Sequence, residues 1–146
     1  MAGLTPRTRE SITVGDKGSF VKTIREEDIF QFADVSGDFN PLHIDEEYAK
    51  KSRFGHRVAH GILMAAIIST VLGGELPGLG TIFVELHIRF LKPVFIGDVI
   101  TANATVMEIV NPKRVRLMVA CVNQNAEDVA IGNAIVVPPE QTQIIA

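Results

Sequence analysis

Strict alternation of apolar and polar positions marks the second half of the chain. Residues 81–90 place apolar side chains at every second position: Ile82, Val84, Leu86, Ile88 and Phe90. A period of two is typical of a β-strand with one buried face, so this stretch is predicted to be a strand with those side chains on one face. The same pattern predicts strands over residues 98–110, 114–123 and 129–137, with turns at 111–112 and 123–128.

The first half combines one strand with helical spacing. Residues 17–24 are predicted to form a strand. Residues 26–35 carry apolar side chains at helical spacing, with acidic residues in the first turn and Gly37 just beyond the end, as expected at the two ends of a helix. Asp45 is a suitable cap for a further short helix over residues 45–51.

The stretch from residue 61 to residue 72 is apolar on every side, which predicts a helix that is buried all round. One such helix followed by a run of strands predicts an α+β fold in which an antiparallel sheet wraps around a central apolar helix, the hot-dog architecture. A chain of 146 residues is expected to form a single domain over residues 1–146.

Two features predict a homodimer. A single sheet of about five strands has open edges, which a second copy would protect. The mean hydropathy of +0.24 is high for a short chain, which indicates either a large core or apolar surface covered by another subunit.

Composition limits the classes of binding partner and the cellular compartment that are expected for this protein. The formal net charge of −3 provides no basic field to attract nucleic acid or an anionic membrane. The longest apolar run is shorter than the roughly 20 residues of a membrane span, and residues 1–16 lack the apolar core of a secretory signal. Cys121, the single cysteine, has apolar neighbours and is predicted to be a buried, inert thiol. A cytoplasmic protein without nucleic-acid or membrane partners is expected.

A run rich in titratable side chains, residues 36–45, carries the candidate chemistry. Asp38 and His43 lie five positions apart, on either side of a turn at Pro41. Because glycine and proline interrupt regular hydrogen bonding, the segment from Asp38 to His43 is predicted to be a loop and not a helix. Either residue alone could be structural, but together they predict an acid/base pair that works near neutral pH.

Gly61 begins the predicted central helix, directly after Ala59 and His60. A glycine there leaves its backbone N–H bare at the positive end of the helix dipole. His60 is expected to brace the backbone and not to react. An acid/base pair beside a bare helix N-terminus is what water addition to an activated carbonyl compound requires.

These residues resemble the MaoC-like (R)-specific enoyl-CoA hydratase family, also called hydratase 2. The family's hydratase motif is matched by residues 37–43, with Asp45 two positions further on, and its Ala-His-Gly entry to the central helix is matched by residues 59–61. Residues 76–78 and 90–98 are also similar to family members. The resemblance covers a core of about residues 15–137.

The resemblance implies an activity and a set of site residues. The family adds water to trans-2-enoyl-CoA to give (R)-3-hydroxyacyl-CoA, reversibly, on a dimeric hot-dog fold without metal or redox cofactor; coenzyme A belongs to the substrate. By resemblance, Asp38 and His43 hold the reacting water, and Gly61 N–H binds the thioester oxygen. Asn40 and Ser69 match substrate-binding positions. In this scheme Asp38 accepts a proton from water and His43 delivers one to C2.

Three other functions compete with this hypothesis. A 3-hydroxyacyl-[acyl-carrier-protein] dehydratase would use a basic rim against an acidic carrier, and that rim could instead bind coenzyme A phosphates; the candidates are Lys50, Lys51, Arg53 and Arg57. A thioesterase on this fold would need a carboxylate on the central helix, which has none. A non-catalytic acyl-thioester-binding protein would not require the acid/base pair.

His56 and His60 stand four positions apart, which raises the possibility of a metal site. The metalloprotease pattern requires glutamate after the first histidine, and Arg57 occupies that position. Gly55 and Gly61 flank the two histidines and make one continuous helix doubtful. No metal is predicted.

Overall fold

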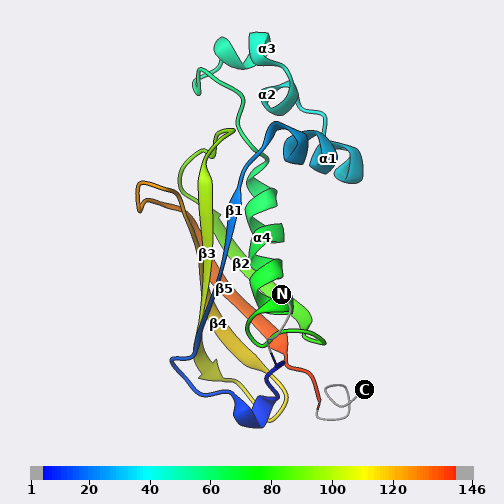
Figure 1. Cartoon of the computed structure of the whole chain (residues 1–146), viewed down its shortest axis with the longest axis vertical. Coiled ribbons are helices and arrows are strands. Elements are labelled where there is room, and N and C mark those ends of the chain that lie inside the picture. Colours follow the sequence, from blue (N-terminus) through cyan, green and yellow to red (C-terminus); the bar gives the residue numbers. More distant parts are fainter. Residues whose placement is uncertain (1–4, 141–146) are drawn as a thin grey trace.

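The computed structural model describes residues 5–140, which form one curled antiparallel sheet around a long helix (Figure 1). The strands pair in the order β1-β3-β4-β5-β2. Their bounds are β1 Lys17–Thr23, β2 Ile82–Phe90, β3 Val99–Ile109, β4 Val115–Val122 and β5 Asp128–Val137. The helices are α1 Glu26–Ser36, α2 Pro41–Ile44, α3 Glu46–Lys50 and α4 Gly61–Gly74, with a 3₁₀ turn at Arg9–Ser11. The predicted α+β hot-dog fold is confirmed.

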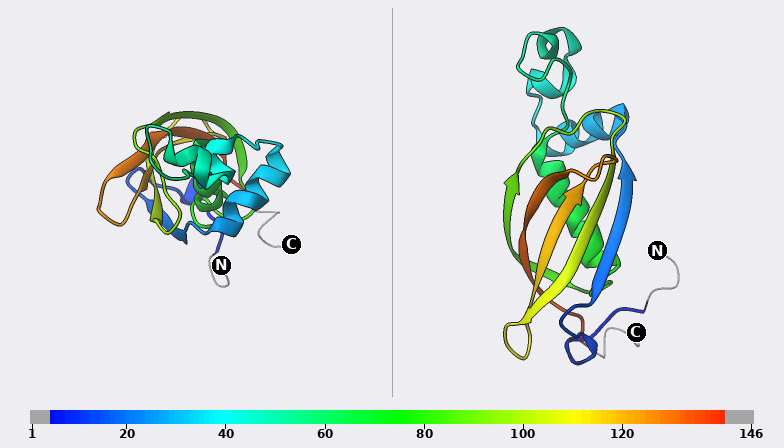
Figure 2. Two further views of the ribbon diagram at one scale, coloured as in Figure 1. Left: turned by 90° about the horizontal axis from the view of Figure 1, so that it is seen from above. Right: turned by 90° about the vertical axis from the view of Figure 1, so that its left-hand side faces the viewer.

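The core lies between α4 and the concave face of the sheet, which curves around the helix in Figure 2. From α4, Met64, Ile68 and Leu72 are almost fully buried, at the spacing of one helix face. Alternate residues of β3 and β4 meet them: Ile100, Ala102, Ala104, Val106, Val115, Leu117, Val119 and Cys121. Each large apolar side chain buried in this way contributes about 1.5–3 kcal/mol.

The prediction that the central helix is buried all round is wrong for the single chain. Ile62 is 52% exposed, and Ala66 and Ser69 are also exposed. These residues are four and three positions apart, so they form one stripe along α4. The sheet covers only one side of the helix, and the stripe lies on the other.

The predicted apolar face of β2 is correct for only part of the strand. A register shift between Phe83 and Glu85 reverses the alternation, so Phe83 packs against the core while Ile82 is 59% and Val84 40% exposed. Such a bulge places two residues opposite one on the neighbouring strand. Leu86 and Ile88 point to the core as predicted.

The predicted helices in the first half are confirmed within a residue or two. The helix α1 ends at Gly37, whose φ of +80° suits glycine and whose N–H donates to the Ala33 carbonyl at 2.8 Å. Asp45 caps α3 by accepting the Tyr48 N–H at 3.1 Å. Together α2 and α3 form a segment, residues 38–57, that projects beyond the end of the sheet (Figure 1); we call it the overhang.

Within residues 5–140, no helix combines the length and apolar character that crossing a bilayer requires.

The close approach of β5 to β2 at Gly132 leads to a prediction about stability. A Cβ added to Gly132 in β5 would collide with the carbonyl oxygen of His87 in β2, whereas one added to Gly73 in α4 meets nothing within 4 Å. We expect Gly132→Ala to lower the free energy of unfolding by about 1–3 kcal/mol, as overpacking does. Gly73→Ala should raise it by about 0.5–1 kcal/mol, because alanine favours the helix. Urea unfolding measures both changes, and equal stabilities of the two variants would contradict the prediction.

Candidate active site

In the loop after α1, side-chain oxygens accept hydrogen bonds from backbone N–H groups. Asp38 Oδ1 accepts the Asn40 N–H at 3.1 Å, and Asn40 Oδ1 accepts the Leu42 N–H at 3.1 Å. Asn40 therefore caps α2, in which Pro41 is the first residue. Proline is tolerated at that position because the first N–H of a helix has no intrahelical partner. The prediction that residues 38–43 form a loop is thus wrong at its end: His43 lies in a one-turn helix, while Asp38 stays in the loop.

His43 has a defined proton position. Its Nδ1 lies 2.7 Å from the carbonyl oxygen of Val58, and because a carbonyl only accepts, Nδ1 carries the hydrogen. The neutral ring then presents a lone pair at Nε2. The pKa of His43 is lowered from its usual value chiefly by burial, against the Val58 carbonyl and Asp38, which raise it; His60 lowers it further. His43 is therefore held towards its neutral form.

His60 lies directly beside this pair and is only 1% exposed. Its Nε2 donates to the carbonyl oxygen of Asp38 at 2.9 Å, and its ring centroid is 3.9 Å from that of His43. Polar atoms of Asp38, His43 and His60 all lie within 4.8 Å of one another. The expectation that His60 braces the backbone is confirmed, and the two predicted acid/base residues are brought together.

A cavity of about 430 Å³ opens onto His43 and His60, whereas Asp38 is exposed and does not line it. Its lining includes His43 and His60, Gly61 at the start of α4, and apolar side chains such as Met64 and Phe90. The His60 side chain makes no capping hydrogen bond to α4, and the Leu63 N–H donates instead to the His60 carbonyl at 3.0 Å. A side chain at Gly61 would meet the Phe90 ring at 3.4 Å, so glycine keeps this approach open.

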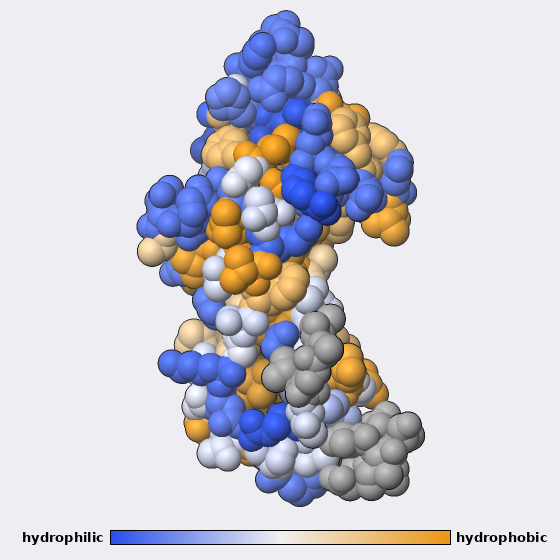
Figure 3. Space-filling model, in the orientation of Figure 1, coloured by the Kyte–Doolittle hydropathy of each residue, from blue (hydrophilic) through white to orange (hydrophobic). Residues whose placement is uncertain are grey.

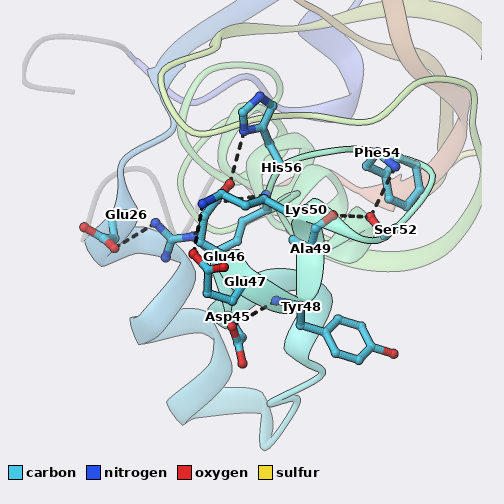
Figure 4. A network of polar contacts seen from close by, with 11 residues as sticks. Glu26, Asp45, Glu46, Glu47, Tyr48, Ala49, Lys50, Ser52, Phe54 and His56 are labelled. Atoms are coloured by element: carbon cyan, nitrogen blue, oxygen red, sulfur yellow. Dashed lines mark hydrogen bonds and ion pairs between the residues drawn. The ribbon is translucent and has the colours of Figure 1, made fainter.

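An ion-pair network fixes the overhang to the rest of the chain. Arg57 pairs with Glu26 of α1 at 2.9 Å and with Glu46 of α3 at 3.2 Å, and Glu46 also meets His56 at 3.1 Å. In Figure 4 Glu26 and Glu46 approach from these two helices. Arg57 is largely buried, so the network anchors the segment that carries His43.

Neither of the two predicted substrate-binding residues, Asn40 and Ser69, lines this cavity. Asn40 is exposed, and its Oδ1 is engaged in capping α2. Ser69 lies in the exposed stripe of α4 and does not line the cavity with His43, His60 and Gly61. Within one chain, the structure therefore gives Ser69 no contact with the acid/base pair.

The predicted basic rim is only partly present. Of its four candidates, Arg53 lines the cavity, with its guanidinium 5.7 Å above the Phe54 ring. Lys50 pairs with Glu47 at 2.9 Å and Arg57 belongs to the anchoring network. Sequence reasoning missed Lys92, which also lines the cavity and pairs with Glu127. Its position in the family-like stretch 90–98 was the available signal.

The histidine pair considered for metal binding does not form a site. His56 is bound to Glu46, whereas His60 donates to the Asp38 carbonyl. The group that could geometrically hold an ion is instead Asp38, His43 and His60. In that group the Nε2 of His60 donates to the Asp38 carbonyl, so the nitrogens with a free lone pair are Nδ1 of His60 and Nε2 of His43.

Cys121 is a buried free thiol, as predicted. Its Sγ lies 3.7 Å from the Met64 carbonyl oxygen, inside the core. Burial raises the pKa of Cys121 to about 12, which keeps the thiol protonated and unreactive.

Residues 2–128 match the MaoC like domain family. The chain belongs to this family. It is 48% identical to an (R)-specific enoyl-CoA hydratase of Rhodospirillum rubrum over 72% of this chain and 73% of that protein. A 3-hydroxybutyryl-CoA dehydratase of Methylorubrum extorquens is 36% identical over 92% of this chain and 85% of that protein.

A solved structure agrees with these relatives. An R-hydratase from Pseudomonas aeruginosa has a TM-score of 0.89 and 38% identity, and covers 93% of this chain and 88% of that one. The predicted membership of the MaoC-like hydratase family is confirmed.

Proposed function

We propose that this MaoC-like protein is a hydro-lyase that adds water to trans-2-enoyl-CoA to give (R)-3-hydroxyacyl-CoA, and that it also catalyses the reverse dehydration. One observation carries the proposal: the Asp38 carboxylate lies within 4.8 Å of His43, and His43 and Gly61 line the same cavity. The hydratase of Rhodospirillum rubrum and the dehydratase of Methylorubrum extorquens support the two directions.

The proton on His43 Nδ1 determines how the pair uses water. Asp38 and the Nε2 of neutral His43 are both acceptors, so one water can donate a hydrogen to each and direct a lone pair at C3 of the substrate. As the C3–O bond forms, the π electrons move to the thioester enolate, and the water passes one proton to His43. That proton then goes to C2, and the new hydroxyl keeps the second hydrogen, held by Asp38.

This sequence of steps refines the assignment made from the residues alone. Neutral His43 has no hydrogen on Nε2, so it delivers a proton to C2 only after it has received one. The hydroxyl and the proton come from one water on one side of the alkene, which implies syn addition. The R configuration rests on the family relationship, since the arrangement of Asp38 and His43 alone does not fix the face of the alkene.

The N-terminus of α4 would stabilise the charge that develops. During attack, negative charge moves to the thioester oxygen, and the Gly61 N–H is suited to donate to it at the positive end of the helix dipole. Losing one such donor typically costs about 3 kcal/mol of barrier. Asn40 would help to hold the reacting groups through its place in the loop between Asp38 and α2.

The cationic rim supports coenzyme A as the carrier of the acyl group. Arg53 and Lys92 line the same cavity as His43, where they suit the phosphate groups of the substrate. No metal or redox cofactor enters the proposed reaction, because acid/base chemistry and one N–H donor account for every proton and charge. We also propose a cytoplasmic location, consistent with a buried free thiol in a reducing compartment; cell fractionation tests it.

We further propose a homodimer joined along β2. At this open edge of the sheet Ile82 and Val84 are exposed, and Phe90 at its end lies next to Gly61 of α4. The edge therefore continues into the exposed stripe of α4, and Figure 3 shows apolar residues gathered across the middle of the molecule, where α4 runs. A second copy would cover both surfaces, including Ser69, whose proposed substrate contact would then form at the interface.

The function is tested by a hydration assay on crotonyl-CoA and longer enoyl thioesters. We expect loss of the enoyl absorbance on coenzyme A substrates, an R product by chiral analysis, and the same rate after exhaustive chelation. Faster turnover of the matching carrier-protein thioesters would favour the dehydratase alternative. An S product would reject the assignment, and activity abolished by chelation and restored by zinc would reject the metal-free chemistry.

The single-water mechanism predicts non-additive losses. Asp38→Asn and His43→Gln should each lower kcat by roughly 10² to 10⁴, the range for a lost acid or base. The double variant should be little worse than the poorer single variant, because the two groups act on one water. Asp34→Asn, an exposed acid on α1, is the control and should be fully active. Melting temperatures should hardly change. Fully multiplicative losses would indicate independent roles for Asp38 and His43.

The dimer is tested by placing a lysine on each open edge of the sheet. Ile82 in β2 and Val21 in β1 are 59% and 57% exposed, so they form a matched pair. Sedimentation at micromolar concentration should give a dimer of 15.9 kDa chains for the wild type and Val21→Lys, and a shift towards monomer for Ile82→Lys. A compact wild-type monomer with full activity would contradict the proposal.

A further inference from the structure

We propose that His60 is a positioning residue for the Asp38–His43 pair, with two separable roles. Its Nε2–H fixes the loop that carries the Asp38 carboxylate, and its ring covers His43 and keeps that residue a neutral base. This inference deepens the proposed function at the same site and rests on it.

The first role is a hydrogen bond between distant parts of the chain. His60 stands just before α4, and its Nε2 donates to the main-chain carbonyl of Asp38, 22 residues earlier, at 2.9 Å. The His60 ring is also 4.8 Å from that of Phe32 in α1, centroid to centroid. Because His60 is 1% exposed and held between α1, α4 and His43, this donor has little freedom. The bond therefore ties the Asp38 loop to the start of the core helix.

The tautomer of His60 follows from its surroundings. The acceptor at Nε2 is a carbonyl, so Nε2 carries the hydrogen. Nδ1 is buried and has no hydrogen-bond partner among residues 5–140, so a proton at Nδ1 would have no acceptor. His60 is thus suited to hold the pair and not to exchange protons, whereas His43 carries its hydrogen on the opposite nitrogen.

The second role is the contact between the two rings. The His43 and His60 centroids are 3.9 Å apart with the planes inclined at 31°, so His60 shields His43 from water on that side. The other charged groups near His43 are Asp38 from the loop and, along the same cavity, Arg53 and Lys92. Burial comes first among the causes that lower the His43 pKa, and the electrostatic effect of His60, whose ring lies 3.9 Å away, lowers it further.

Two substitutions separate these roles. In His60→Gln the side-chain amide reaches about as far as Nε2, so the donor to the Asp38 carbonyl is kept while the ring is lost. In His60→Phe a ring of similar size remains against His43 and Phe32 while the donor is lost. His56→Gln is the matched control, because His56 is an exposed histidine outside the pair and its loss leaves the Arg57 ion pairs intact.

We expect different kinetic signatures from the two variants. His60→Phe should lower kcat by roughly 10- to 100-fold with little change in KM, since a misplaced catalytic group slows chemistry more than binding. His60→Gln should keep kcat within about threefold of wild type. Its kcat/KM should fall at a higher pH than in wild type, because water reaching His43 raises its pKa and neutral His43 is the base. His56→Gln should match wild type in both measurements.

A purely space-filling His60 would give another result. Both variants would then lose kcat in proportion to their loss of stability, and the acid limb of the pH profile would stay in place; that outcome overturns the proposal. Recovery of kcat by glutamine but not by phenylalanine supports the donor role, and the shifted acid limb supports the ring role.

Nitrogen NMR of the histidine rings gives a test that needs neither activity nor a variant. In the wild-type protein we expect His60 to keep its hydrogen on Nε2 while His43 keeps one on Nδ1. A hydrogen on Nδ1 of His60 would overturn the inference. If no thioester is hydrated, the proposed function fails. The ring tautomers and the titration of His43 still test whether His60 donates to the Asp38 loop and shields His43 from water.

Discussion

Burial of one face of α4 against the concave sheet is the constraint on which the rest of this molecule depends. The helix provides nearly fully buried side chains at helical spacing, and β3 and β4 provide buried residues at every second position. Because the core fixes α4, it also fixes the start of the helix, where His60 and Gly61 lie. The site is therefore attached to the buried core of the fold, although Asp38 and His43 come from the projecting overhang.

Backbone carbonyls, and not side-chain carboxylates, set the chemistry of the two histidines. Val58 accepts from Nδ1 of His43, and Asp38 accepts from Nε2 of His60 through its main chain. A carbonyl cannot donate, so each contact determines which nitrogen carries the hydrogen. The Asp38 side chain uses one oxygen to accept the Asn40 N–H, and the proposed reaction assigns the other oxygen to the water. The path of the backbone thus determines which ring nitrogen carries the hydrogen in His43 and in His60.

The same architecture leaves surfaces that a single chain does not cover. Among residues 5–140 the sheet ends at two unpaired edges, and α4 presents Ile62, Ala66 and Ser69 to the outside. Both edges expose apolar side chains, Ile82 and Val84 in β2 and Val21 in β1, and at the end of β2 the exposed Phe90 lies next to Gly61 of α4. An apolar helix with an open stripe next to an apolar sheet edge is consistent with a fold completed by a second copy.

The sequence alone determined the pattern of elements and the family. Alternation fixed β3, β4 and β5, Gly37 marked the end of α1, and Asp45 marked the cap of α3, because these signals are local. The hydratase motif and the Ala-His-Gly run identified Asp38, His43 and Gly61 as candidates. Only the tertiary structure decided that His43 lies in a helical turn, that a bulge exchanges Ile82 for Phe83 in the core, and that Ser69 faces outward. It also decided the tautomers of His43 and His60, since these depend on carbonyls 15 and 22 residues away, and contacts at that separation leave no periodic trace in a sequence.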